Sequence, residues 1–209
     1  MKYLTNLLVL PGLILVGCSK ATDPTATAVA PTAISAPVQQ LAIERGKAIA
    51  METFSLLSSN LQSAIQQGGV SNALPFCSLA ASPLTSGMAA KHEVTLRRVT
   101  HRPRNPAGRA DATEQAVLNR FAAMMTGTNP PPPWVTNLAP NTVTFFAPIL
   151  LNSELCLKCH GEPGRDIAAE NLAVIRKFYP QDEATGFKLG DLRGAWRIDF
   201  PLAPLSVGH

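Results

Sequence analysis

The run Cys156-Leu-Lys-Cys159-His160 constrains this chain more tightly than any other part of its 209 residues. Two cysteines separated by two residues and followed directly by a histidine fit the attachment pattern of a c-type haem. On one helical turn, the two thiols reach the two vinyl groups of a single porphyrin and form thioethers, and the adjacent imidazole reaches the iron from the same side. We therefore expect one covalently attached haem c on Cys156 and Cys159, with His160 as the proximal iron ligand.

Three other uses of the cysteine pair remain open at this point. A thioredoxin-like redox pair has the same spacing, although the elements expected around it do not resemble a thioredoxin βαβ unit. A zinc site normally needs a second pair of ligands, and the spacing of His92, His101 and His209 does not supply one. A structural disulfide across two residues is strained and usually reactive. Haem attachment is the interpretation that the spacing favours.

The first seventeen residues are expected to form a signal peptide rather than part of the fold. Lys2 gives a positive start, and the mostly apolar run from Leu4 to Val16 is well below the ~20 residues that span a bilayer. The run ends in Leu15-Val16-Gly17-Cys18, which resembles the lipobox of bacterial lipoproteins. We expect Cys18 to carry a lipid that anchors the protein to a bacterial membrane in the periplasm, and Ser19 weakly favours the outer membrane. An ordinary secretory signal with a chance cysteine is the alternative.

Residues 18–38 are rich in Ala, Thr and Pro and have no hydrophobic period, which predicts a flexible tether. The haem-binding domain is expected to cover residues 39–205. No later segment is long and apolar enough to span a membrane, so contact with the membrane is expected through the lipid alone.

Helical periodicity begins directly after the tether. Between Gln39 and Gln67, apolar residues recur every three or four positions, at Phe54, Leu57, Leu61 and Ile65. This pattern predicts an amphipathic helix that ends at Gly68-Gly69. A second helix is expected from Val70 to Lys91, although Pro75 and Pro83 weigh against its continuity. Further helices are expected over Ala110–Met125, with Leu118, Phe121 and Met125 on one face, and over Asp166–Phe178.

The expected strands lie mostly in the second half of the chain. The β-branched residues of Glu93–Thr100 predict one strand, and Trp134–Leu151 predicts two strands on either side of Pro140-Asn141. The second of these delivers the chain to the cysteine pair, and a final strand is expected around Ala195–Phe200. Helices first and strands later predict an α+β domain built on an antiparallel sheet.

Cys77 is the thiol that remains once Cys18, Cys156 and Cys159 are assigned. A lone thiol in an oxidising compartment needs an explanation, which makes Cys77 a candidate for the second axial ligand of the iron. The other candidates that the sequence offers are His92, His101, Met88, Met124 and Met125. Of these, Met124 and Met125 are better explained as core residues of a helix.

Three blocks of sequence resemble one known family. They are the stretch from Cys77 to Pro106, the run Cys156-Leu-Lys-Cys-His-Gly161, and the tail from Tyr179 to Gly194. Together, over residues 39–203, they resemble the Tll0287-like haem domain, most specifically in Val94-Thr-Leu-Arg-Arg-Val99 followed by Arg102-Pro-Arg-Asn-Pro106. The resemblance implies a PAS-like antiparallel sheet with flanking helices, one haem c, and a redox or ligand-sensing role. It also implies that Cys77 and His160 are the two iron ligands.

A thiolate ligand donates electron density to iron and stabilises the ferric state, so we expect a low reduction potential. The basic cluster Arg97, Arg98, Arg102 and Arg104 is expected to meet the haem propionates, because arginine pairs with carboxylates through two hydrogen bonds. Arg97, Arg102 and Arg104 are the candidate haem-binding residues of this cluster. A solvated strand face is the alternative explanation.

The function expected from these features is a haem-based redox or small-ligand sensor. The alternatives are a periplasmic electron-transfer cytochrome and, less favoured, a peroxidase-like enzyme. A sensor needs a distal ligand that leaves the iron, whereas an electron carrier keeps both ligands. The sequence contains no signalling module, so the output is expected to pass to a separate redox or signalling partner protein. The modest net charge of +4 gives no sign of a nucleic-acid partner.

Overall fold

The computed structural model describes residues 33–127 and 129–206. The expected signal peptide, the lipidation candidate Cys18, most of the tether and His209 lie outside the described residues. Within the described residues, no helix combines the length and apolar character that a membrane span requires.

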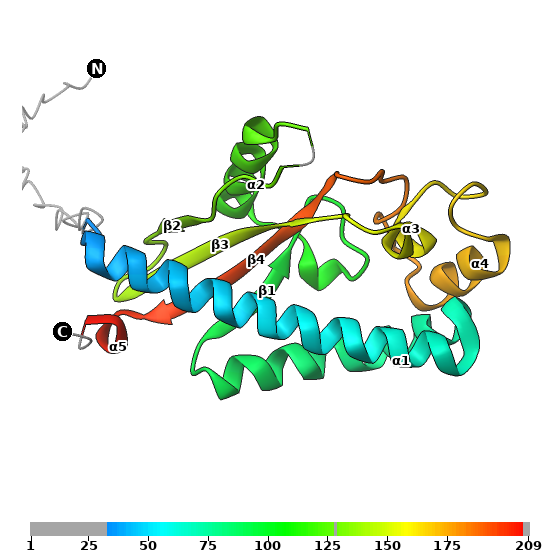
Figure 1. Cartoon of the computed structure of the whole chain (residues 1–209), viewed down its shortest axis with the longest axis horizontal. Helices are drawn as coiled ribbons and strands as arrows, with labels where there is room; N and C mark the ends of the chain where they lie inside the picture. The colour runs from blue at the N-terminus through cyan, green and yellow to red at the C-terminus, as the bar shows by residue number, and fades with distance from the viewer. Residues whose placement is uncertain (1–32, 128, 207–209) are drawn as a thin grey trace, which may run out of the picture. The chain divides into compact units, whose positions relative to one another are not determined.

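Four strands form one sheet, in which every neighbouring pair is antiparallel (Figure 1). The spatial order is β1-β4-β3-β2. The strands are β1 (Thr95–Val99), β2 (Trp134–Thr136), β3 (Thr142–Leu150) and β4 (Leu192–Pro201). The predicted α+β class, with an antiparallel sheet and flanking helices, is therefore confirmed.

The first helix, α1 (Ala36–Lys91), turns back on itself at the predicted pair of glycines (Figure 1). Gly69 has φ 74° and ψ −174°, a backbone conformation that is essentially restricted to glycine. The two arms of α1 therefore correspond to the two predicted helices, and the break between them is where the sequence predicts it. Pro75 and Pro83 both lie inside the second arm without ending it.

The apolar face predicted for the first arm of α1 is confirmed only in part, since Leu57, Leu61 and Ile65 are half-buried and Leu57 packs against the core. Phe54 is 51% exposed, and the buried positions include the small residues Ala42, Gly46 and Ala50. A Cβ atom on Gly46 would lie only 2.5 Å from the ring of Phe145. The first arm thus approaches the sheet closely through small residues. A pattern of large apolar side chains does not indicate such a face.

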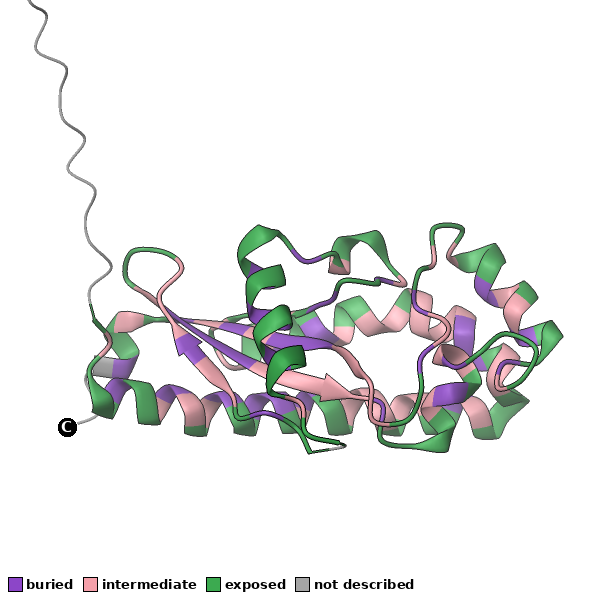
Figure 2. Ribbon diagram, turned by 90° about the horizontal axis from the view of Figure 1, so that it is seen from above, coloured by how far each residue is buried: buried purple, intermediate pink, exposed green. Residues whose placement is uncertain are grey.

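Much of the sheet is buried (Figure 2), and apolar residues pack on both of its faces. On one face, Phe145, Ile198 and Phe200 pack against α1. On the other face, Phe146 and Ala195 pack against α2 (Ala112–Met124). Helix α2 begins two residues later than predicted, because Asp111 accepts a hydrogen bond from the backbone N–H of Glu114 and forms a capping box with it.

Met124 is 39% exposed, so its expected role as a core residue of α2 is wrong. Met125 is half-buried and caps the C-terminus of the helix.

The predicted strands are present, and several strand and helix boundaries differ from those expected. Strand β1 covers Thr95–Val99 rather than Glu93–Thr100. Strand β4 begins at Leu192 rather than at Ala195, because its first residues pair with the end of β3. The helix expected from Asp166 begins at Ala169, since the preceding residues form a turn in which Asp166 accepts a hydrogen bond from the backbone N–H of Glu162.

Three short α-helices and one 3-10 helix, η1 (Pro106–Gly108), complete the described part of the chain. Helices α3 (Glu154–His160) and α4 (Ala169–Phe178) follow β3 at one end of the sheet (Figure 1). The short C-terminal helix α5 (Leu202–Ser206) was not predicted.

Candidate haem site

Helix α3 carries the whole cysteine–histidine motif. Its first turn is capped by Ser153, whose side-chain oxygen accepts a hydrogen bond from the backbone N–H of Leu155 at 3.1 Å. Cys156 packs beside an apolar cluster that includes Leu157 and Phe187. Cys159 packs beside a second cluster formed with α1 and α4. Both cysteines are free thiols, and both are half-buried.

His160 is held in a defined tautomer. Its Nδ1 atom lies 2.8 Å from the backbone carbonyl oxygen of Ala184. A carbonyl only accepts hydrogen bonds, so Nδ1 carries the proton and the lone pair of Nε2 is left for another partner. Burial lowers the pKa of His160 well below its ordinary value, and the charges of Arg104 and Arg193 lower it further. The imidazole is therefore neutral, which is the form that binds a metal ion.

The segment that supplies the Ala184 carbonyl is fixed against α3. The backbone N–H of Gly186 donates to the carbonyl of Gly161 at 2.7 Å, and that of Phe187 donates to the carbonyl of His160 at 2.9 Å. Gly186 has φ 74°, a left-handed conformation that favours glycine. The Phe187 ring lies nearly perpendicular to the imidazole, with 6.4 Å between ring centroids. These contacts orient His160 through backbone atoms, for which the sequence carries no signal.

Cys77 lies on the second arm of α1, which packs beside α3 and α4. Leu74, three residues before Cys77, belongs to the same apolar cluster as Cys159. The arm is also tied to α4 by a hydrogen bond of 2.7 Å from Ser71 Oγ to Asn171 Oδ1. Residues three apart lie on one face of a helix, so Cys77 faces this end of the molecule as well.

The electrostatic effects on Cys77, Cys159 and His160 also indicate that these three residues lie near one another. The charges of Arg98 and Arg104 act on both Cys77 and His160, and a charge on Cys77 raises the pKa of Cys159. Burial raises the pKa of the Cys77 thiol, and the two arginines oppose this effect. The structure therefore brings Cys77 together with the motif.

The other candidates for the distal ligand have different surroundings. His92 binds Glu52 through Nε2 at 2.8 Å, at the end of α1 farthest from the glycine turn. Met88 is buried in the core between α1 and the sheet. Met124 and Met125 belong to α2, which covers the opposite face of the sheet. His101 is exposed in the loop after β1.

The three candidate arginines already have partners in the protein. Arg104 donates to both carboxylate oxygens of Asp182, at 3.1 and 3.2 Å, and to the backbone carbonyl of Cys159 at 2.5 Å. Arg102 donates to the backbone carbonyls of Glu183 and Thr185, and its guanidinium lies 4.2 Å from the centroid of the Phe187 ring. These two arginines hold the segment that carries Ala184.

Arg97 lies on the other side of the sheet. Side chains alternate between the two faces of a strand, and Arg97 pairs at 3.6 Å with the buried carboxylate of Glu114 on α2. The structure therefore separates Arg97 from the motif and places its neighbour Arg98 on the same face as α1. The sequence did not indicate three further residues of this region, Asp182, Phe187 and Arg193. Each of them acts through contacts between segments that are distant in the chain.

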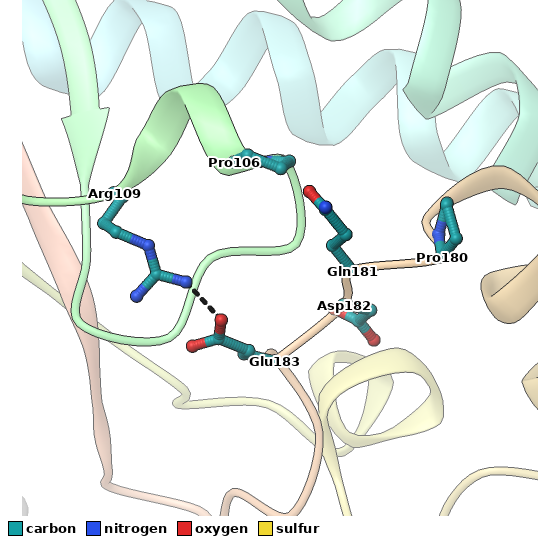
Figure 3. A pocket seen from close by; sticks show the side chains of 6 residues that line it. All are labelled: Pro106, Arg109, Pro180, Gln181, Asp182 and Glu183. Carbon is teal, nitrogen blue, oxygen red and sulfur yellow. Dashed lines mark hydrogen bonds and ion pairs between the residues drawn. The ribbon is translucent and has the colours of Figure 1, made fainter.

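A surface pocket of about 430 Å³ lies beside residues 180–183 (Figure 3). An ion pair between Arg109 and Glu183 crosses it. Its lining residues are Pro106, Arg109, Pro180, Gln181, Asp182 and Glu183. None of the motif residues contributes to it, so this pocket is separate from the candidate haem site.

The donor set fits a c-type haem. It combines two free thiols at the required spacing, a neutral imidazole with an available Nε2 atom, and a third thiol on the helix packed beside them. The wholly antiparallel sheet also argues against a thioredoxin-like unit, whose central element is βαβ. Fold and site together define an α+β protein with a cysteine–histidine motif at one end of an antiparallel sheet.

Comparison with known proteins identifies the family. The Tll0287-like family model matches residues 28–201, so this chain belongs to the Tll0287-like family, as the resemblance predicted. The crystal structure of the cyanobacterial haem protein Tll0287 is similar, with 25% sequence identity and a TM-score of 0.53. The match covers 76% of this chain and 94% of that one. No curated protein matches this chain.

Proposed function

We propose that this chain is an exported c-type haem protein that acts as a redox or small-ligand sensor. The haem is attached to Cys156 and Cys159, with His160 and Cys77 as the iron ligands. The observation that carries the proposal is the hydrogen bond from His160 Nδ1 to the Ala184 carbonyl, which leaves Nε2 available for iron. The similarity to a cyanobacterial haem protein supports the same assignment.

When bound, the haem supplies a one-electron redox couple and an iron that takes axial ligands. The protein decides how firmly the second ligand is held. Burial favours the neutral thiol of Cys77, whereas the charges of Arg98 and Arg104 favour the thiolate. Cys77 would hold the iron through Sγ as a thiolate, and Sγ is also the atom that would take up a proton if this ligand were released. In a sensor, the haem would then supply a position for a small diatomic ligand.

An electron-transfer cytochrome is the second candidate, and the exposure of α3 favours it. Leu155, next to Cys156, is 37% exposed, and Glu154 and Lys158 are exposed as well. A haem bonded to this helix lies near the surface, where electrons pass to a partner. The two candidates differ in whether Cys77 stays bound after reduction.

Absorption and EPR spectra of oxidised and reduced protein test the proposal. The chain is produced in a host with c-type haem maturation, beside Cys77→Ala and the control Met124→Leu. We expect covalent haem with a low-spin ferric thiolate signal that Cys77→Ala abolishes and Met124→Leu leaves unchanged. Loss of the thiolate on reduction supports the sensor, and its retention supports the carrier. Absence of covalent haem contradicts both.

A redox titration gives a second test of the same ligand set. A thiolate ligand lowers the reduction potential of the haem, so we expect a low midpoint potential that rises in Cys77→Ala. A clearly positive midpoint in the unchanged protein contradicts thiolate ligation.

We also propose that the protein is anchored in the periplasm through a lipid on Cys18 and passes its output to a separate protein. The lipobox-like run before Cys18 carries this part of the proposal. Metabolic labelling with a radioactive fatty acid tests it directly. We expect the label and the membrane association to be lost together in Cys18→Ala, and membrane association that survives this change contradicts it.

A further inference from the structure

Arg98 is the arginine of the basic cluster that faces the candidate haem site. Side chains on β1 alternate between the faces of the sheet, and Leu96, two residues earlier, is buried against α1. Arg98 pairs in register with Trp196, whose ring also belongs to the core under α1. The Arg98 guanidinium lies 5.9 Å from the centroid of that ring. Arg98 therefore points to the side that carries Cys77.

Arg98 differs from its neighbours in having its donors available. Among the described residues, the Arg98 side chain makes no hydrogen bond or ion pair, and the residue is exposed. Arg104, in contrast, uses its guanidinium on Asp182 and on backbone carbonyls. An arginine that stacks on an aromatic ring and keeps a fork of N–H groups open is prepared for a planar carboxylate.

The charges around the site also favour a negatively charged ligand. Arg193 donates to the hydroxyl of Thr100 and to the carbonyl of Arg102, which are both neutral. Burial, together with the neighbouring charges of Arg104 and Arg98, lowers the pKa of Arg193 to about 10. The carboxylate of Asp182 is already bound by Arg104. Arg98, Arg104 and Arg193 therefore influence one another beside a carboxylate that is already paired, and an anionic ligand would stabilise this group of arginines.

Arg98 also lies near both proposed iron ligands. Its charge lowers the pKa of Cys77, on α1, and that of His160, on α3. A haem held by these two residues would present two propionate carboxylates. We propose that Arg98 binds a haem propionate through two hydrogen bonds, an assignment that rests on the proposed haem attachment.

Infrared redox-difference spectra of the holoprotein test this assignment. The haem is labelled biosynthetically from δ-aminolevulinate that carries ¹³C at its carboxyl group, so that propionate bands are identified by their isotope shift. We compare the unchanged protein with Arg98→Met, with Arg98→Lys, and with Arg176→Met. Arg176 is an exposed residue of α4, and its replacement removes the same charge away from β1.

We expect the labelled carboxylate bands to shift in both Arg98 variants and to stay in place in Arg176→Met. Lysine keeps the charge but lacks the two-pronged donor. The midpoint potential should therefore fall in Arg98→Met, where a positive charge near the iron is lost, and stay close to the original value in Arg98→Lys. If Arg98→Met does not accumulate as folded protein, the carboxylate bands of Arg98→Lys alone are compared with those of the unchanged protein.

Propionate bands that are the same in Arg98→Lys, Arg98→Met and the unchanged protein overturn the assignment. This outcome is distinct from failure of the proposed function, which appears as an absence of covalent haem in the unchanged protein. An unchanged ligand set with shifted bands supports the role of Arg98 whether or not Cys77 leaves the iron.

Discussion

At the scale of single residues, Arg104 connects the parts of the candidate site. It pairs with Asp182 and donates to the carbonyl of Cys159, so one side chain links the loop after β1, the end of α3 and the segment before β4. The side chains of Arg104 and Asp182 are only 12% and 7% exposed. An ion pair so well shielded from water is costly to break on one side, because the remaining charge stays buried.

Arg104→Met is therefore expected to lower the free energy of unfolding by about 3–5 kcal/mol. Urea unfolding followed by circular dichroism measures the change. The control Arg176→Met, on the exposed side of α4, should change stability by no more than about 0.5 kcal/mol. Equal effects of the two replacements would show that the Arg104–Asp182 pair contributes little.

Asp166 makes the protein sensitive to acid. Its carboxylate accepts hydrogen bonds from the Arg165 guanidinium at 2.7 Å and from the Glu162 backbone N–H at 2.8 Å. These two contacts lower its pKa from 3.8 to about 2. Since the folded state binds the proton more weakly than the unfolded state, the stabilisation is complete above the unfolded pKa and is lost as the pH falls toward the folded pKa.

Asp166→Asn is expected to remove this contribution. Urea midpoints measured between about pH 5 and pH 2 should fall less steeply in Asp166→Asn than in the unchanged protein. Parallel curves for the two proteins would mean that Asp166 is not the group that titrates.

At the scale of elements, the turn of α1 at Gly68-Gly69 decides where Cys77 lies. It folds the second arm back so that Leu74 and Cys77 reach α3 and α4. The turn depends on the backbone of Gly69, since residues with a side chain rarely adopt φ 74° and ψ −174°.

Gly69→Ala is expected to lower stability by about 1–3 kcal/mol through backbone strain alone, because no atom lies within 4 Å of the new Cβ position. Gly87→Ala is the matched control within the same helix. Its Cβ also meets no atom within 4 Å and its φ is ordinary, so it should gain about 0.5–1 kcal/mol. Thermal unfolding of both variants measures the difference, and a neutral Gly69→Ala would contradict the role of the turn.

At the scale of the whole molecule, the sheet forms a stable platform and the candidate site is assembled beyond one end of it. Strands β3 and β4 pair over nearly their whole length, whereas α3 and residues 182–187 are held mainly by turns and by the contacts of a few side chains. A ligand bound to α3 should therefore stabilise the site more than the sheet.

Hydrogen exchange measured with and without haem tests this difference. We expect the haem-free chain, produced without haem maturation, to exchange faster in α3 and in residues 182–187 than the haem-loaded chain. Amides in the paired part of β3 and β4 serve as the internal control and should exchange at similar rates in both. Uniform protection across the chain would contradict a separate, ligand-stabilised site.

Local patterns in the sequence determined much of this protein. The motif from Cys156 to His160, the glycine break in α1 and the order of helices and strands all depend on residues close together in the chain. For this reason they were predictable, and so was the family. The sequence also indicated Cys77 as the one thiol without an assigned role, and the structure brings this residue beside α3.

Only the tertiary structure decided on which face of the sheet each arginine of β1 lies. Arg97 and Arg98 are adjacent in the sequence, yet Arg97 binds Glu114 on α2 and Arg98 stacks on Trp196 on the face that packs against α1, because β1 pairs with β4 in a particular register. The same holds for the exposed side chain of Phe54 and for the Ala184 carbonyl that orients His160. These features depend on contacts between segments distant in the chain, and a local pattern does not encode them.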